Sequence, residues 1–505
     1  MLKKGLAVTV ILLFIGMCVI PSTAVTELKE VSTVSFDGNT LYVGGTGPNN
    51  YTTIQSAIDD AVDGDTVFVY DDSSPYIESV LIDKSIQLVG ENKTTTIIDS
   101  PSQMTIRNYH ADNFLIKGFT LLNHFSPQYA TYGVSLWFAK NCTLTETRII
   151  GCHWGVQFLD NSNCSITNNE IQDGFIGIDV AESSSCTIYG NQLTDNNYGI
   201  ELNRAENINI SDNKFTNNGL YFLNRHSNAI ILNNTVNDKE LLYLENEHDL
   251  ILDNISIGQL FLIGCNNITM KNIEISNASI GIEIIDSHNC LITKSKIHSN
   301  LGTGITFVRE CRNTIITHSD ISNNTKGIYV MTGKLYKSSI NGNTFRFNGV
   351  GMDISCLETT VKDNIIENCN QGLGISCFIT TVKDNIIKNC NQGIVLNVGL
   401  LSFLTNNQIT NNDIGLFLDE PFFSCIIRSN NFIDNQKHAD FVLWPIMGCG
   451  GRFLNNYWDD LSSSGLKVIV GKRNTITGFD AMGPKYSLIP WIKFDLNPAQ
   501  EPYDI

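Results

Sequence analysis

The feature that most constrains this chain is a short segment that recurs along most of its length. One copy, Asn163-Cys-Ser-Ile-Thr-Asn-Asn169-Glu-Ile171, consists of an alternating apolar stretch, an Asn, one further residue and an aliphatic residue. The Asn recurs every 18 to 24 residues, and Thr147, Ser295 and Ser319 take its place in three copies. Such a regular period indicates one structural unit repeated lengthwise, as in a solenoid. The Asn positions are Asn169, Asn191, Asn213, Asn234, Asn254, Asn272, Asn343, Asn364, Asn385, Asn407 and Asn430.

Each copy has a second landmark, a Gly that opens another short strand. Examples are Gly177-Ile-Asp-Val and Gly199-Ile-Glu-Leu, and similar segments occur from Gly155 to Gly415. Side chains alternate along a strand, so the first and third residues after each Gly are predicted to face the core and the second to face outward. Stacked units would form parallel ladders about 4.8 Å apart. An inward Asn at each turn can then bond to the Asn of the neighbouring coil, as side-chain ladders do in stacked sheets. We therefore predict an all-β fold, a single parallel β-helix with a structural Asn ladder.

The two ends of the repeat array differ from its middle. Apolar residues at helical spacing predict one amphipathic helix, which Thr52 or Thr53 can cap and which ends before Gly64. Because the open ends of a solenoid need covers, we predict that this helix is the N-terminal cap and that the irregular tail at 438–505 is the C-terminal cap. The apolar helix positions are Ile54, Ala57, Ile58, Ala61 and Val62.

The N-terminus has the pattern of a secretory signal peptide. Lys3 and Lys4 precede an apolar run at residues 8–20, and Ser22-Thr-Ala24 offers a small-residue cleavage site. The run is short for a membrane span, and the alternative is an uncleaved anchor. The predicted organisation is a signal peptide at 1–24, a leader with the N-terminal cap at 25–78, β-helix coils at 79–437 and a C-terminal capping segment at 438–505.

Other features of the composition also favour a location outside the cytoplasm. A formal charge of -18 argues against nucleic acid and anionic membrane surfaces as partners. Asn-x-Ser/Thr sequons, which accept N-linked glycans, are frequent. We expect a secreted, extracellular or cell-surface glycoprotein with no membrane span in the mature chain. The sequons begin at Asn50, Asn92, Asn141, Asn163, Asn209, Asn233, Asn254, Asn267, Asn277 and Asn323.

Several cysteines are spaced by one period. Cys356 and Cys377 are 21 residues apart, as are Cys369 and Cys390. Residues one period apart would lie on adjacent coils, at a distance compatible with a disulfide. Buried free cysteines that act as small hydrophobic residues fit the pattern equally well, so both interpretations stay open. No Cys/His spacing suits zinc.

The helix–strand entry at Tyr51–Val69 and the Asn-Cys-Ser-Ile…Gly-Ile coils resemble the right-handed parallel β-helix of pectin-lyase-like proteins, in particular NosD-like (CASH-type) repeat proteins. Asn455-Asn-Tyr-Trp458 is similar to the end of NosD-like repeats, and the last residues resemble those of secreted β-helix proteins of methanogenic archaea. The resemblance implies a right-handed β-helix over residues 40–505. It implies little about activity, because this fold hosts lyases, hydrolases, epimerases, adhesins and inert shafts. NosD proteins are associated with copper-site maturation, but the histidines are scattered and form no copper site in the sequence pattern.

Motif sets of polysaccharide enzymes on this fold are incomplete here. No His-Gly or Arg-Ile-Lys segment occurs, the Asp-Asp pairs lie outside the central coils, and the Asp-Pro-His-Asp of alginate epimerases is absent. The chain is therefore not expected to be an enzyme, and no catalytic residue is predicted.

The remaining candidate site is the outward position after each Gly. Gln157, Asp179 and Glu201 take it on three consecutive coils, and Trp154 and Tyr198 lie just before their Gly residues. Carboxylates one coil apart can accept sugar hydroxyls, share a Ca²⁺ ion or act as a pair in retaining glycoside hydrolysis. The aromatic rings can stack on sugar rings. The structural alternative is a solvated acidic face whose aromatic residues pack a turn.

We expect an exported cell-surface β-helix protein that binds or displays carbohydrate. Its partners would be polysaccharide or cell-envelope components, and no cofactor is predicted, although the acidic row could hold a Ca²⁺ ion. One alternative is a polysaccharide lyase, hydrolase or epimerase. Another is a structural envelope shaft or adhesin with no small ligand.

Overall fold

The computed structural model describes residues 36–124, 129–223, 228–398, 401–420, 424–443, 451–461, 465–480 and 483–505. The predicted signal peptide at residues 1–24 lies outside them. None of the helices in the described part of the chain is long and apolar enough to cross a membrane.

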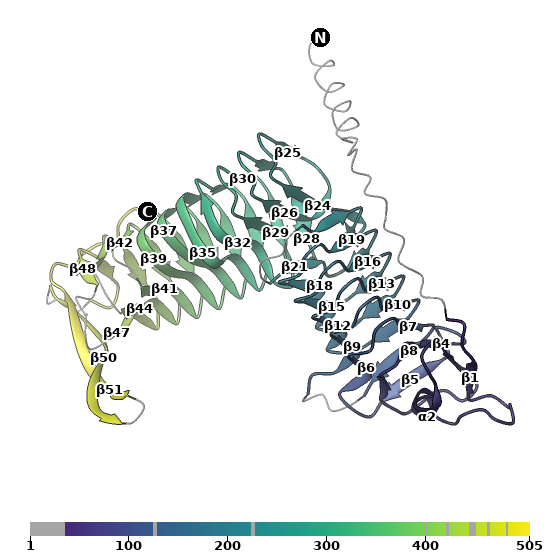
Figure 1. The fold of residues 1–505 in the computed structure, drawn as a ribbon. Coiled ribbons are helices and arrows are strands. Elements are labelled where there is room, and N and C mark those ends of the chain that lie inside the picture. The colour runs from purple at the N-terminus through teal and green to yellow at the C-terminus, as the bar shows by residue number, and fades with distance from the viewer. Residues whose placement is uncertain are drawn as a thin grey trace, which may run out of the picture.

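The chain folds into a right-handed parallel β-helix with a bend near its middle (Figure 1). Each strand pairs with the strand one coil before and one coil after it, so β13 (Ser165–Thr167) lies between β10 (Thr143–Thr145) and β16 (Thr187–Tyr189). Among the described strands, only two pairs are antiparallel, β23 with β24 and β50 with β51. The predicted all-β solenoid is confirmed.

The strands form four sheets. Sheet A contains β1 (Thr40–Val43), β2 (Thr66–Val69), β4 (Gln87–Gly90), β7 (Leu115–Lys117), β10, β13, β16, β19 (Asn209–Ser211) and β22 (Ile230–Leu232). Sheet C contains β3 (Val80–Ile82), β6 (Met104–Tyr109), β9 (Tyr132–Trp137), β12 (Trp154–Leu159), β15 (Ile176–Ala181), β18 (Tyr198–Asn203) and β21 (Leu220–Phe222). Sheet D contains β28 (Glu274–Ser276), β31 (Lys296–His298), β34 (Asp320–Ser322), β36 (Thr344–Arg346), β38 (Ile365–Glu367), β40 (Ile386–Lys388), β43 (Gln408–Thr410), β46 (Asn431–Ile433) and β49 (Tyr457–Trp458).

Sheet B contains the remaining strands. They are β5 (Ile97–Ser100), β8 (Thr120–Asn123), β11 (Arg148–Ile150), β14 (Glu170–Gln172), β17 (Gln192–Thr194), β20 (Lys214–Thr216), β23 (Thr235–Val236), β24 (Lys239–Glu245), β25 (Ile251–Asp253), β26 (Ile257–Ile263), β27 (Thr269–Lys271), β29 (Ile282–Ile285), β30 (Leu291–Thr293), β32 (Thr303–Arg312), β33 (Ile315–Thr317), β35 (Lys326–Asn341), β37 (Val350–Lys362), β39 (Gln371–Lys383), β41 (Gln392–Val398), β42 (Leu401–Thr405), β44 (Ile414–Glu420), β45 (Ser424–Arg428), β47 (Lys437–Leu443), β48 (Arg452–Leu454), β50 (Lys467–Asp480) and β51 (Gly483–Asp495).

The Gly at the start of the sheet C strands β12, β15 and β18 is required by the close approach of neighbouring coils. At Gly177, a Cβ atom would lie 2.6 Å from the carbonyl oxygen of Gly199 in the next coil. No side chain fits at that distance, so the position accepts only Gly.

The Asn ladder consists of buried side chains that link each coil to the next. Asn169 donates from its backbone N–H and from Nδ2 to Asn191 Oδ1, at 2.9 and 3.0 Å, and Nδ2 also donates to Leu144 O at 3.0 Å. Asn191 makes the same bonds to Asn213 and Ile166. Each carboxamide thus pairs turn groups that would otherwise be buried without partners.

Two predicted members of the ladder are wrong. Asn254 and Asn272 are exposed, with φ angles of 55° and 52°, and occupy the left-handed turn position that precedes the ladder slot. In the second of these coils the slot holds Ile273, whose N–H donates to Ser295 Oγ at 3.4 Å. An apolar residue there interrupts the side-chain ladder, which resumes at Ser295.

Both ends of the β-helix are covered. Helix α2 (Ile54–Asp60) buries Ile54, Ala57 and Ile58, and the Thr53 hydroxyl caps it by accepting from Ser56 N–H at 3.2 Å. At the other end the buried Asp495 carboxylate accepts from the N–H groups of Asn455 and Asn456, at 3.1 and 2.9 Å. It also accepts from Asn456 Nδ2 at 3.0 Å, so a carboxylate ends the Asn ladder.

The bend divides the β-helix into arm 1 (residues 36–236) and arm 2 (residues 239–505). Sheet C ends at β21, and the side chain of Gln259 takes the place of a further strand. Leu220 N–H donates to Gln259 Oε1 at 3.0 Å, and Gln259 Nε2 donates to Leu220 O at 2.7 Å. The buried hydrophobic side chains form two clusters, and the one in arm 1 also includes Leu241, Phe261, Ala278 and Ile285 of arm 2.

The outer face of arm 2 covers the end of arm 1. Phe261 is in register with Glu283, at the outward position of its strand, yet it is fully buried. Its ring lies 4.9 Å from that of Phe222, an inward residue of the last sheet C strand. The open hydrophobic end of arm 1 is therefore capped by the side of arm 2.

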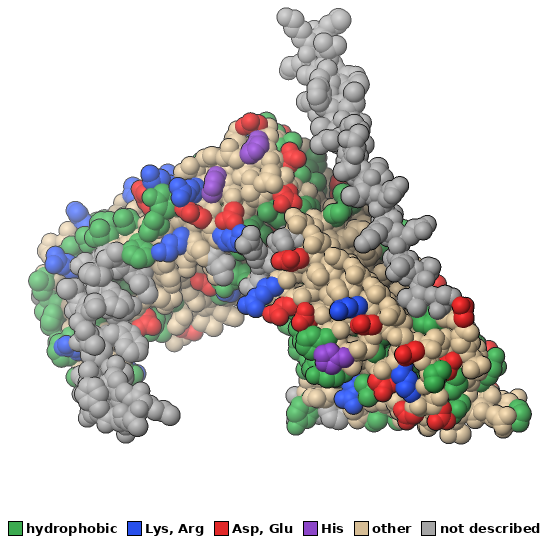
Figure 2. Space-filling view, in the orientation of Figure 1, with side chains coloured by type: hydrophobic (Ala, Val, Ile, Leu, Met, Phe, Trp, Pro, Cys, Tyr) green, Lys and Arg blue, Asp and Glu red, His purple; other side chains and the backbone are tan. Residues whose placement is uncertain are grey.

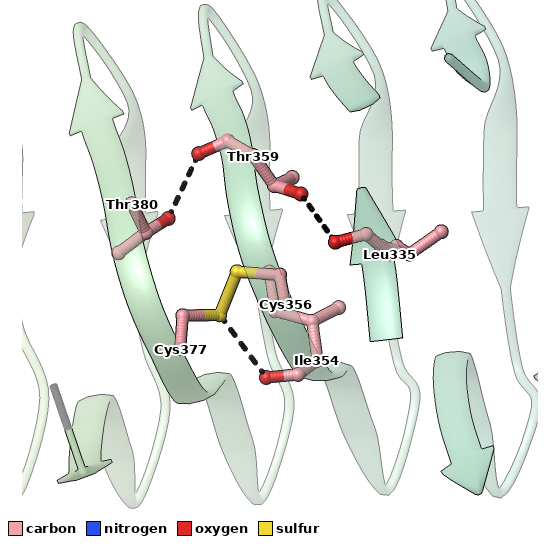
Figure 3. The surroundings of a disulfide bond; sticks show 6 residues. All are labelled: Leu335, Ile354, Cys356, Thr359, Cys377 and Thr380. Carbon is pink, nitrogen blue, oxygen red and sulfur yellow. Dashed lines mark hydrogen bonds between the residues drawn. A yellow bond between two sulfur atoms is a disulfide. The ribbon is translucent and has the colours of Figure 1, made fainter. Parts of the chain in front are cut away.

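The cysteines show both of the arrangements that the sequence left open. Cys356 and Cys377 form a disulfide between adjacent coils, with a Cα–Cα distance of 4.5 Å (Figure 3). Ten other cysteines in the described part of the chain are free and buried, including Cys369 and Cys390.

Replacing a ladder residue should destabilise the fold strongly. Asn191→Ala removes four hydrogen bonds to buried groups of the two neighbouring coils, and each group left without a partner costs about 1–3 kcal/mol. We expect the free energy of unfolding, measured by chemical denaturation, to fall by about 3 kcal/mol or more. The control Asn254→Gly, at an exposed turn whose φ angle suits Gly, should change it by less than about 0.5 kcal/mol. Equal effects of the two substitutions would contradict the ladder.

Thiol labelling should distinguish the two kinds of cysteine. After denaturation without a reducing agent, an alkylating reagent should modify peptides that contain Cys369 and Cys390. Peptides that contain Cys356 and Cys377 should be modified only after reduction, because their sulfurs are bonded to each other. Peptide mass spectrometry reads both results, and modification of Cys356 without reduction would rule out the disulfide.

Candidate functional site

The acidic row, Gln157, Asp179 and Glu201, lies on the outward face of sheet C in arm 1. β12, β15 and β18 place these three residues in register on consecutive coils, with Ser135 of β9 before them and Tyr221 of β21 after them. The sequence-based prediction of one residue per coil therefore matches the strand register.

The acidic row is less exposed than its outward direction suggests. Asp179 and Glu201 are only 9% and 8% exposed, and Gln157 is half-buried. The strand register places a further row of side chains on each side, and the expectation of a solvated acidic face is wrong at these two buried carboxylates. The preceding row is Tyr132, Trp154, Ile176 and Tyr198, and the following row is Trp137, Leu159, Ala181 and Asn203.

The preceding row, which we call the aromatic row, presents half-buried rings along the axis. Trp154 stacks on Tyr132 with ring centroids 4.9 Å apart, and Tyr198 stacks on Tyr221 at 4.6 Å. Ile176 separates the two pairs, so Trp154 and Tyr198 are two coils apart, as their spacing predicts. Flat apolar surface thus borders the carboxylates over four coils.

Hydrogen bonds fix one end of the acidic row. Ser135 Oγ and Trp137 Nε1 both donate to Gln157 Oε1, at 3.1 and 3.2 Å. The amide of Gln157 is thereby oriented so that it hydrogen-bonds to Asp179. The sequence analysis missed Ser135 and Trp137, although each lies one period before a residue of the site or its neighbour.

Burial changes the ionisation of the two carboxyl groups. It raises the pKa of Asp179 to about 6, against a smaller opposing effect of the hydrogen bond from Gln157. Burial, and to a lesser degree the negative charge of Asp179, raises the pKa of Glu201 to about 7. Near neutral pH the pair thus offers both a carboxylate and a protonated carboxyl group, which can accept and donate hydrogen bonds.

The acidic row does not continue as a site into arm 2. Glu283 takes the equivalent position but is fully buried where arm 2 covers arm 1, and burial raises its pKa to about 8. In the described part of the chain, neither carboxylate oxygen of Glu283 has a hydrogen-bond partner of normal geometry. Asp353, farther along, forms an ion pair with Lys326 at 2.8 Å. Glu283 is therefore part of the bend, and Asp353 is part of an ion pair on arm 2.

A metal site needs several ligand atoms close together. Among the described residues, one group of three or more His, Cys, Asp or Glu has its ligand atoms within 4.8 Å of one another, and it consists of His438, Asp459 and Asp460. His438 Nε2 lies 2.8 Å from Asp459 Oδ1, and Lys467 forms an ion pair with Asp460. His438 and Lys467 each have a carboxylate partner beside the buried Trp458, so we interpret this group as part of the C-terminal cap. Ca²⁺ at the acidic row remains a hypothesis.

The surface of the two arms shown in Figure 2 carries few charged side chains. In Figure 2 both arms are mostly tan, the colour of backbone and uncharged polar side chains. Acidic side chains gather towards the start of arm 1, around α2, β5 and β8, while lysines and arginines gather on arm 2 around β37 and β42. The face shown therefore carries no broad basic patch on arm 1.

Comparison with protein families agrees with this architecture. The family described as "Periplasmic copper-binding protein (NosD)" matches residues 58–249, and the family "Right handed beta helix region" matches residues 258–396. The chain is a NosD-like right-handed parallel β-helix protein. The boundary between the two matches, at residues 249–258, lies just after the bend, at the start of arm 2. No curated protein matches the sequence.

Solved structures match this NosD-like chain with low sequence identity and low TM-scores. The A-module of Azotobacter vinelandii mannuronan C-5 epimerase AlgE6 is 14% identical, with a TM-score of 0.31, over 79% of this chain and 92% of that one. The catalytic domain of a GH87 alpha-1,3-glucanase in complex with nigerose is 12% identical, with a TM-score of 0.32, over 77% and 67%. Dettilon tailspike protein gp208 is 13% identical, with a TM-score of 0.26, over 88% and 75%.

The residues of the NosD-like segment do not fit a copper centre. Copper sites use clustered Cys, His or Met ligands. In the described part of residues 58–249, no three His, Cys, Asp or Glu residues bring their ligand atoms together, and the His438 group lies outside this segment and offers mainly oxygen. The cysteines of arm 1 are buried in the core, where the Sγ of Cys164 lies 3.5 Å from Ala139 O.

The buried carboxyl pair should make stability depend on pH. The folded-state pKa values of about 6 and 7 lie above the unfolded values of about 4, so the folded chain binds more protons between about pH 4 and 7. The free energy of unfolding should therefore fall as the pH rises through this window. Glu201→Gln should flatten that dependence in thermal or urea unfolding, whereas Glu206→Gln, at an exposed position, should not. A wild-type slope in Glu201→Gln would show that Glu201 titrates normally.

Proposed function

We propose that this protein is exported and binds polysaccharide along the outward face of sheet C in arm 1. The observation that carries the proposal is the row of Gln157, Asp179 and Glu201 beside half-buried Trp154 and Tyr198, in register over consecutive coils. Aromatic rings pack against the apolar faces of sugars, and carboxyl and amide groups bond to their hydroxyls. The repeat of the coils suits a chain of repeating sugar units.

The charge of this face selects the kind of sugar. Asp179 and Glu201 are adjacent acids that carry at least part of a negative charge at neutral pH, and no Lys or Arg lies in the acidic row or the aromatic row. A uronate-rich polymer would be repelled. We therefore expect neutral or amine-bearing polysaccharides to bind and acidic ones to bind weakly. The "periplasmic" description of the matching family supports a location outside the cytoplasm.

A second candidate function is glycoside hydrolysis by the same carboxyl pair. Retaining hydrolases use two carboxyl groups about 5–5.5 Å apart, and residues on adjacent coils are separated by about 4.8 Å. The raised pKa of Glu201, about 7, would let it act as the acid while Asp179 stays more ionised. Release of reducing ends from a bound polysaccharide, lost in Glu201→Gln while binding persists, would favour this function over binding alone.

A binding panel tests the proposal directly. Affinity electrophoresis of the purified protein against neutral, amine-bearing and uronate-rich polysaccharides should show retardation by the first two classes. Trp154→Ala should weaken this binding about tenfold or more, because it removes a stacking platform worth about 1–3 kcal/mol by analogy with base stacking. The matched control Tyr189→Ala removes a 44% exposed aromatic residue from sheet A and should leave binding unchanged.

Two outcomes would contradict the proposal. Retardation by none of the polysaccharides would leave the structural shaft or adhesin as the better account. Equal effects of Trp154→Ala and Tyr189→Ala would move the binding surface away from sheet C. Addition of Ca²⁺ or of a chelator to the same gels tests for this ion, which should strengthen binding only if the acidic row holds it.

A further inference from the structure

Arm 2 carries a shallow groove that the acidic row does not reach. Its volume is about 610 Å³, and it lies where the chain turns into the Gly-opened strands β35, β37, β39, β41 and β44. It is the same position on the coil that the aromatic row occupies in arm 1. The side chains that matter here are Lys326, Asn370, Gln371, Asn391, Gln392 and Asp413.

Four carboxamides repeat along this groove. Two nearly identical coils place Asn370-Gln371 and Asn391-Gln392 one period apart, and Gln371 is in register with Gln392. Both asparagines are exposed and both glutamines are half-buried. No side-chain hydrogen bond to another described residue forms at any of the four, whereas the buried Asn412 nearby bonds to Asn435 at 2.9 Å. These amides are therefore available to a ligand.

The charged groups at the two ends of the groove already have side-chain partners. Lys326 Nζ lies 2.8 Å from Asp353 Oδ2 and 3.6 Å from the centre of the Tyr329 ring. At the other end Asp413 Oδ1 accepts from Gln436 Nε2 at 2.7 Å. Between these two ends the groove offers uncharged amides and the half-buried apolar side chain of Val350, which suits an uncharged ligand.

We propose that this groove is a second binding site, which takes an uncharged glycan chain lying along the axis of arm 2. Each carboxamide provides a donor and an acceptor, which matches the hydroxyl groups of a sugar. The amide pairs repeat at the coil spacing of about 4.8 Å, close to the length of one sugar unit in an extended chain. An extended peptide would instead need a free strand edge, and β39 is paired on both sides.

The inference extends the proposed function to a second surface but does not require the arm 1 site. The test uses the full chain and uncharged probes: glucomannan, hydroxyethylcellulose and dextran in affinity electrophoresis, and neutral oligosaccharides in calorimetry. The double variant Gln371→Ala/Gln392→Ala should weaken binding of at least one probe about tenfold, because two hydrogen bonds of about 0.5–1.5 kcal/mol are lost. The control Gln192→Ala removes an exposed amide of arm 1 and should have no effect.

Trp154→Ala separates the two sites. Binding that is lost in the double variant but kept in Trp154→Ala supports the groove, even if the arm 1 proposal fails. Binding that is lost in Trp154→Ala and unchanged in the double variant overturns the groove and leaves the arm 1 proposal standing. No binding of any uncharged probe overturns the groove. Unfolding curves of both variants that match the wild type show that the loss is local.

Discussion

The structure depends on the stacking of one coil on the next, and the buried Asn carboxamide is the interaction that fixes it. Each carboxamide accepts from the backbone and side chain of one neighbour and donates to another coil, so it replaces main-chain pairing at a turn where strands cannot pair. Hydrophobic burial would tolerate small sliding of one coil over another. The ladder does not, because its hydrogen bonds reach their normal length at one register only.

Much of this architecture follows from the sequence because its period is the period of the structure. The template of Asn, one residue and an aliphatic residue locates the ladder wherever the aliphatic residue is buried two positions later, as at Asn169 and Ile171. Asn254 and Asn272 were misplaced because Asn also suits the left-handed turn one residue earlier. Counting from the buried Ile275 back to Ile273 would have identified the correct slot.

The bend and the burial of the acids could not be predicted in this way. Period-two alternation shows that Asp179 points away from the core, but its exposure depends on the size of neighbours on other coils. The bend arises from contacts between Phe222 and Phe261 that no local pattern specifies. The same contact explains Glu283, whose slot is solvent-facing in a straight β-helix and enclosed at the bend.

The bend also has a consequence for how the molecule comes apart. In a straight solenoid, nearest-neighbour contacts pass cooperativity from coil to coil along one core. Here the core changes from one hydrophobic cluster to another at the junction, where Leu241, Phe261, Ala278 and Ile285 of arm 2 belong to the cluster of arm 1. The junction also uses the Gln259 amide and the Ser279 hydroxyl, which is bonded to Asn197 O at 2.8 Å. Because arm 2 supplies part of this cluster, its loss would expose the end of arm 1. Unfolding can start at the bend or at the caps, depending on which arm unfolds first.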